Sequence, residues 1–114
     1  MSTSIPSGTT LRGRQQVRHL KRQMRTGACE TAAPEARETG QSSVVELLER
    51  SMRFGHERLA MKRLEQAVHL GATLSDAHWK YCRAVALRSV DRSLQECFLA
   101  LAIRHGHSSF THSN

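Results

Sequence analysis

The stretch SVVELLERSMRF, residues 43–54, decides our prediction of the fold. Ser43 followed three residues later by Glu46 is a capping box, in which each side chain bonds the other residue's backbone amide at a helix start. After it, apolar residues recur at the spacing of one helical face: Val44, Leu47, Leu48 and Met52. The stretch therefore predicts a helix that begins at Ser43 and runs to about Phe54.

The helical spacing continues along the apolar part of the chain. Beyond Gly55, which is either a break or a bend, it runs through Leu59 and Leu64 to a C-cap candidate at Gly71. Ser75 or Asp76 caps the next helix and Asp91 the last one, whose apolar face is Leu94, Cys97, Phe98, Leu101 and Ile103. No stretch shows the alternation of apolar and polar residues, with β-branched residues, that is typical of a strand. We predict an all-α fold, either two stacked helical hairpins or one long bent helix plus a hairpin.

The apolar residues also divide the chain into three regions. They make up about half of residues 44–104 but about a quarter of residues 1–43. We therefore predict a basic, largely disordered arm and linker over residues 1–42, a helical core over 43–106 and a flexible tail over 107–114. Within the arm, residues 11–25 could form a helix, and residues 26–42 read as linker. A core of about 60 residues is marginally stable alone, so we expect a partner chain or a homodimer.

Positive charge is concentrated in the arm. The 114 residues carry a net charge of +7, and the first 25 contain no acid but six basic residues: Arg12, Arg14, Arg18, Lys21, Arg22 and Arg25. On a helix, all of these except Arg12 fall within about 100° of one another, beside a stripe of Val17, Leu20 and Met24. Such a face suits the phosphates of RNA or DNA. A solvated tail, a mitochondrial transit peptide and a binding site for an anionic membrane surface are the alternatives, the membrane being the weakest.

An internal repeat appears when the chain is shifted by 35 residues. The shift superimposes Met52 on Leu87, Leu59 on Leu94, Leu64 on Leu99, Ala67 on Ala102, Val68 on Ile103 and Gly71 on Gly106. Two helix–turn–helix units of this kind would stack, because neither can bury its apolar stripe alone.

The period and the small residues at the helix contacts resemble tetratricopeptide-type repeats. Residues 76–81, DAHWKY, followed by Leu99 and Ala102, are similar to the first-helix aromatic and second-helix small residue of that family. Arg83 and Gln95 depart from its pattern, and no proline closes either unit. The resemblance implies a groove that binds a peptide or helix of another protein, as in small secretion chaperones.

Neither catalytic nor metal-binding patterns are present in the sequence. It has no phosphate loop or GxGxxG, and both of its aspartates, Asp76 and Asp91, stand at expected helix caps. The seven histidines, with Cys82 and Cys97, match no closed zinc spacing. We therefore expect no enzyme activity, no metal and no cofactor. Three cysteines without a signal peptide indicate an intracellular, reducing compartment, which would be mitochondrial if the arm is a transit peptide.

These patterns favour a non-enzymatic interaction protein, adaptor-like or chaperone-like. Its expected partner surface is Trp79, Tyr81, Leu87, Leu94 and Phe98, although Trp79 also suits the main aromatic of the core. The alternative is a nucleic-acid-binding regulator or viral-type RNA binder that uses the six basic residues and dimerises through its core. After removal of residues 1–42, a nucleic-acid binder should lose most of its affinity, whereas an adaptor should keep its partner. Two further expectations are costs of about 2–5 kcal/mol for Leu99→Ala if Leu99 is buried, and about 1 kcal/mol for Ser43→Ala.

Overall fold

The computed structural model describes the backbone of residues 5–105, and the side chains from Gly13 onward. Five helices form within this range, and no strand: α1 (Ile5–Ala28), α2 (Pro34–Arg53), α3 (Glu57–Leu70), α4 (Asp76–Arg88) and α5 (Arg92–Arg104). The prediction of an all-α fold built from helical hairpins is confirmed. The predicted tail, residues 107–114, lies outside the described residues. No helix in the described range is both long and apolar enough to cross a membrane.

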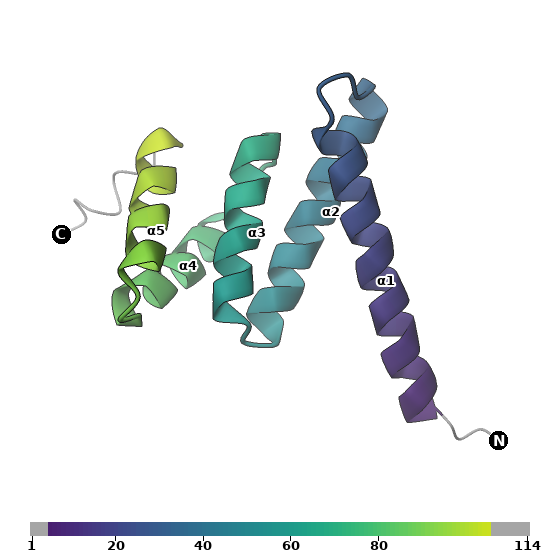
Figure 1. The fold of residues 1–114 in the computed structure, drawn as a ribbon, viewed down its shortest axis with the longest axis horizontal. Coiled ribbons are helices and arrows are strands. Elements are labelled where there is room, and N and C mark those ends of the chain that lie inside the picture. Colours follow the sequence, from purple (N-terminus) through teal and green to yellow (C-terminus); the bar gives the residue numbers. More distant parts are fainter. Residues whose placement is uncertain (1–4, 106–114) are drawn as a thin grey trace.

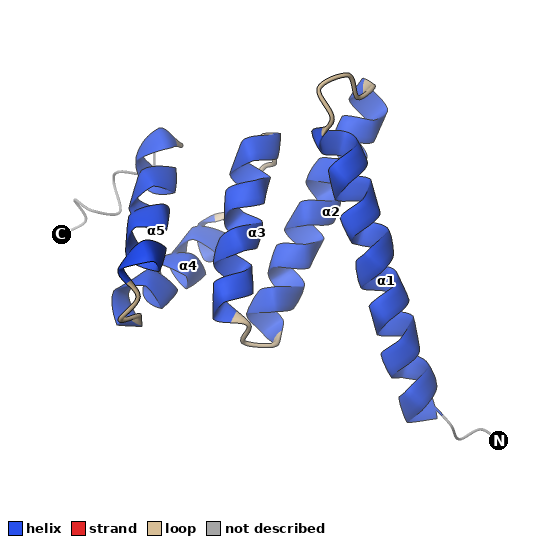
Figure 2. Cartoon of the chain, viewed as in Figure 1, coloured by secondary structure: helices blue, strands red, loops and turns tan. Residues whose placement is uncertain are grey.

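The helices follow one another in chain order across the molecule, and α4 lies behind α3 and α5 (Figure 1). Short connections join them, so neighbours in sequence run in opposite directions (Figure 2). Gly55 and Gly71 adopt left-handed backbone angles, with φ of 72° and 75°. Such angles favour glycine and end α2 and α3 sharply. Because the chain breaks at Gly55, the predicted core consists of two hairpins, α2–α3 and α4–α5, and not of one long bent helix plus a hairpin.

The helix that was predicted to begin at Ser43 begins earlier than expected. α2 starts at Pro34, which occupies its first turn, where the missing proline amide costs no hydrogen bond. Residues 34–42 are therefore helical rather than part of a linker, and Ser43 lies in the middle of α2. The capping box at Ser43 is wrong: its hydroxyl donates to Gln23 Oε1 of α1, over 2.7 Å. The helix expected over residues 11–25 is confirmed as part of the longer α1.

Two apolar clusters hold the helices together. One joins α2, α3, α4 and α5 and contains Leu48, Met61, Leu64, Trp79 and Phe98. The other joins α1, α2 and α3, and contains Leu20, Met24, Val44, Leu47, Ala67 and Leu70. Because Leu20 and Met24 are buried against the neighbouring helices, α1 is packed onto the hairpins through its apolar stripe.

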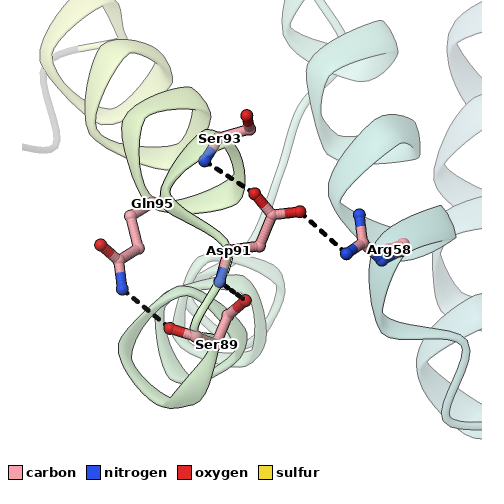
Figure 3. Close-up of polar contacts among 5 residues, drawn as sticks. All are labelled: Arg58, Ser89, Asp91, Ser93 and Gln95. Carbon is pink, nitrogen blue, oxygen red and sulfur yellow. Dashed lines mark hydrogen bonds and ion pairs between the residues drawn. The ribbon is translucent and has the colours of Figure 1, made fainter.

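Polar contacts fix the start of the last hairpin's two helices. At α4, the Ser75 amide donates to His78 Nδ1 over 3.0 Å. Acceptance at Nδ1 leaves the ring proton on Nε2, which donates to Glu49 of α2 over 2.9 Å. At α5, Asp91 accepts from the Ser93 amide over 2.9 Å (Figure 3), which confirms its predicted capping role.

Asp91 also links the two hairpins. Its second carboxylate oxygen lies 2.8 Å from Arg58 of α3 (Figure 3). The Ser93 amide and, after it, the Arg58 guanidinium hold the pKa of Asp91 below its ordinary value. The N-terminal end of α5 is thus fixed to α3 by one side chain.

The helix ends at the turn between α2 and α3 and at the turn between α4 and α5 repeat with the predicted period. α2 and α4 end at Arg53 and Arg88, and α3 and α5 begin at Glu57 and Arg92, so both pairs are 35 residues apart. Burial does not repeat in the same way. Leu64 is fully buried, whereas its counterpart Leu99 is 45% exposed, and Ile103 is also exposed. Ile103 is therefore not part of the buried face of α5, because no described helix covers the outer side of the second hairpin.

Candidate functional site

The five residues predicted to contact a partner do not form one surface. Trp79 is completely buried, and its ring packs edge-on to that of Phe98 at 6.1 Å between centroids. The structure therefore assigns these two aromatic residues to the core, in the cluster that joins α2, α3, α4 and α5. Tyr81 and Leu94 are half-buried. Only Leu87, which is 68% exposed, lies fully on the surface.

The predicted basic residues do share one side of α1. Arg14, Arg18, Arg22 and Arg25 are exposed and Lys21 is half-buried; Arg12 belongs to α1, but its side chain lies outside the described ones. The helical spacing predicted the stripe of Val17, Leu20 and Met24 next to them, and the structure adds that this stripe faces the other helices.

An open groove of about 910 Å³ lies where α1, α2 and the start of α3 meet. Its apolar lining is Val17, Leu47, Phe54 and Leu59, and its cationic lining is Arg14, Arg18, Lys21 and Arg50. Gly13, Gln16, Ser51 and His56 complete it. Phe54 is 60% exposed and Leu59 37%, so this groove displays apolar surface to solvent.

The groove exists because α1 and α2 are close at one end and apart at the other. Near their connection, a Cβ built on Gly27 would lie 2.9 Å from the Gly40 Cα, so the two backbones touch. From there the helices diverge toward the start of α1 (Figure 1). Towards this open end, Arg50 reaches across from α2 to α1, where its guanidinium would lie 3.6 Å from a Cβ on Gly13.

Sequence reasoning missed that α1 packs beside α2 and forms one wall of this groove. It treated residues 1–42 as a separate arm, and therefore placed the basic side chains of the arm apart from Leu47, Phe54 and Leu59 of the core. The amphipathic spacing of Val17, Leu20 and Met24 was the available signal, since a stripe of this kind packs against other helices.

A second hollow, of about 310 Å³, lies between α1, α3 and α5. Its lining mixes apolar groups with charges of both signs: Met24, Arg25, Ala28, Glu65, Gln66, His69, Leu70 and Arg104. Arg63 of α3 is buried and donates to Gln66 over 2.9 Å. Burial, and then the charge of Arg25, lower the pKa of Arg63. Arg63 does not line this hollow, so its buried charge does not define a ligand site there.

The histidines are dispersed. Among residues 5–105, no three His, Cys, Asp or Glu side chains gather in an arrangement that could hold a metal ion. His78 is engaged by Ser75 and Glu49, as described above, whereas His107 and His112 lie beyond the described range. The groove between α1 and α2 is therefore the site in the described residues that combines exposed apolar surface with a uniform charge.

Comparisons with protein-family models, with curated proteins and with solved structures give no match to this chain. The resemblance to tetratricopeptide-type repeats stays a prediction, and the function must be argued from the geometry of the groove.

Proposed function

We propose that this protein is a non-enzymatic helical interaction protein, adaptor-like or chaperone-like, that binds another polypeptide in the groove between α1, α2 and α3. The observation that carries the proposal is the exposure of Phe54 and Leu59 beside Val17 and Leu47 in one concave surface. Exposed apolar side chains gathered in a hollow are typical of interaction sites, since covering them removes apolar area from water.

A photo-crosslinking amino acid in place of Phe54 tests this proposal in the cells that produce the protein. Val90 provides the matched control, because it is fully exposed and apolar but is not among the residues that line the groove. We expect crosslinks to a discrete polypeptide from position 54 and none to that polypeptide from position 90. Equal crosslinking from both positions, or crosslinks to nucleic acid alone, would contradict the proposal.

Nucleic-acid binding through α1 is the second candidate, and the exposed cations on one face of the helix favour it. Arg22 and Arg25 separate the two candidates, because both are exposed and neither lines the groove. If RNA or DNA is the partner, replacing each of them with alanine should remove one phosphate contact. The slope of log K against log salt should then become shallower by about one for each replacement. If a polypeptide occupies the groove, the same changes should leave its binding unaltered.

Substitutions are preferable to removal of residues 1–42 in this test. A cut before Ser43 would divide α2, which begins at Pro34, and would expose the buried face that Leu20 and Met24 cover. Loss of binding in the shortened chain would then report a damaged fold, whatever the partner.

A further inference from the structure

The charge around the groove is of one sign. Arg14, Arg18 and Lys21 stand along the α1 wall and Arg50 along the α2 wall, and no aspartate or glutamate lines the groove. A carboxylate does stand beside the groove: Glu46 accepts from the lining residue Gln16 over 3.2 Å. Four cations around one hollow repel one another, and an occupant that brings negative charge relieves the repulsion.

The spacing of the α1 cations defines the geometry of a complementary partner. Arg14, Arg18 and Lys21 are four and three residues apart on one helix, so they cover two turns, a rise of about 10 Å. Carboxylates at positions i, i+4 and i+7 of a second helix have the same separation. A helix laid along α1 could therefore place one carboxylate opposite each cation.

The lining between the two walls favours a polypeptide over a nucleic-acid backbone. Val17, Leu47, Phe54 and Leu59 offer apolar surface that phosphates and riboses cannot use, whereas the apolar stripe of an amphipathic helix can cover it. Among the lining residues, the rings are those of Phe54 and His56, with centroids 6.2 Å apart, so successive bases have no longer row of rings on which to stack.

We infer that the occupant of the groove is an acidic amphipathic helix of another protein, an inference that rests on the proposed function. Its apolar stripe covers Phe54 and Leu59, and its carboxylates at i, i+4 and i+7 lie opposite Arg14, Arg18 and Lys21. Lys21 is the half-buried member of the three. Apolar burial supplies affinity, and the cations select against neutral and basic helices.

Three synthetic helical peptides of about 18 residues test the inference. They share one apolar stripe and differ at the i, i+4 and i+7 positions, which carry Glu, Gln or Lys. Binding to the full chain is followed by fluorescence anisotropy. We expect the Glu peptide to bind about tenfold more tightly than the Gln peptide at low salt, with the difference shrinking as salt rises, and the Lys peptide to bind more weakly than both.

Charge reversal in the protein sharpens the test. Arg18→Glu should weaken binding of the Glu peptide and strengthen binding of the Lys peptide. Arg22→Glu makes an equal change of charge outside the groove, and it should alter each affinity much less. Unfolding curves followed by circular dichroism check that both variants fold. Equal binding of all three peptides, binding of none, or equal effects of the two reversals would overturn the inference.

The outcomes also separate this inference from the proposed function. If Phe54→Ser weakens binding of all three peptides equally and the charge of the peptides has no effect, the groove binds polypeptides but the inference of an acidic partner is wrong. If duplex DNA or single-stranded RNA displaces the Glu peptide and itself binds more tightly, while crosslinking from position 54 yields nucleic acid alone, the proposed function fails as well.

Discussion

Gly27 of α1 and Gly40 of α2 lie in direct backbone contact. A Cβ added to Gly27 would come within 2.7 Å of the Ala36 carbonyl oxygen, and a Cβ added to Gly40 within 2.9 Å of the Gly27 Cα. These atoms belong to the backbone and cannot rotate away as a flexible side chain could. The contact fixes the closed end of the α1–α2 pair, and with it the opening of the groove at the other end.

Gly27→Ala should therefore destabilise the protein although alanine is the better helix former. Alanine gains about 1 kcal/mol of helix propensity, but the methyl group forces α1 and α2 apart at a cost of about 1–3 kcal/mol. Gly13→Ala is the control, since its Cβ would meet only the end of Arg50 at 3.6 Å, and it should be neutral or stabilising. Urea unfolding followed by circular dichroism measures both; a stabilised Gly27→Ala variant would contradict the close contact.

Ser43→Ala should cost about 0.5–1.5 kcal/mol, because it leaves the half-buried Gln23 carbonyl without its donor. A helix cap at Ser43 would give a similar figure, so the single variant does not separate the two causes. A double-mutant cycle does. With Gln23→Ala, the two changes should be non-additive, because they remove the same hydrogen bond. Additive effects in the unfolding free energies would favour a local role of Ser43 within α2.

Leu64→Ala and Leu99→Ala should differ widely although the two leucines are equivalent in the 35-residue period. Leu64 is fully buried, so its truncation should cost about 2–5 kcal/mol. Leu99 is 45% exposed, and its truncation should cost less than about 1 kcal/mol, which corrects the expectation for a buried Leu99. Chemical denaturation of both variants gives the comparison. A large loss at Leu99 would mean that the outer face of α5 is covered, for example by a second copy.

The thiols of Cys29 and Cys82 should react with alkylating reagents at very different rates. Burial raises the pKa of Cys82 to about 12, whereas hydrogen bonds from Thr31 lower the pKa of the exposed Cys29. Because the thiolate is the reactive form, Cys29 should be alkylated first at about pH 8, and Cys82 only when the chain unfolds. Mass spectrometry over time assigns each site, and Cys29→Ser should remove the fast phase. Early labelling of Cys82 in the folded protein would contradict its burial.

Several elements of the fold could be read from local sequence. The apolar spacing of α3, the glycine that ends it and the Asp91 cap each depend on residues close together in the chain, so local stereochemistry is sufficient to predict them, whereas Gly55 was compatible with either a break or a bend. The charged face of α1 was predicted in the same way. The start of α2 was not predicted, because proline and glycine are typical of linkers. In the structure Pro34 stands in the first turn of α2, and Gly40 lets the backbone of α1 approach closely.

Local sequence was sufficient to predict that the chain is helical, that the turn inside a hairpin recurs after 35 residues and that positive charge is concentrated on one side of α1. Tertiary structure alone decided that α1 packs on α2, that Trp79 and Phe98 are enclosed, and that Phe54 lies in the same groove as Arg14 and Arg18. Helix formation depends on neighbours within one or two turns, whereas burial and the meeting of distant side chains depend on how whole helices cross.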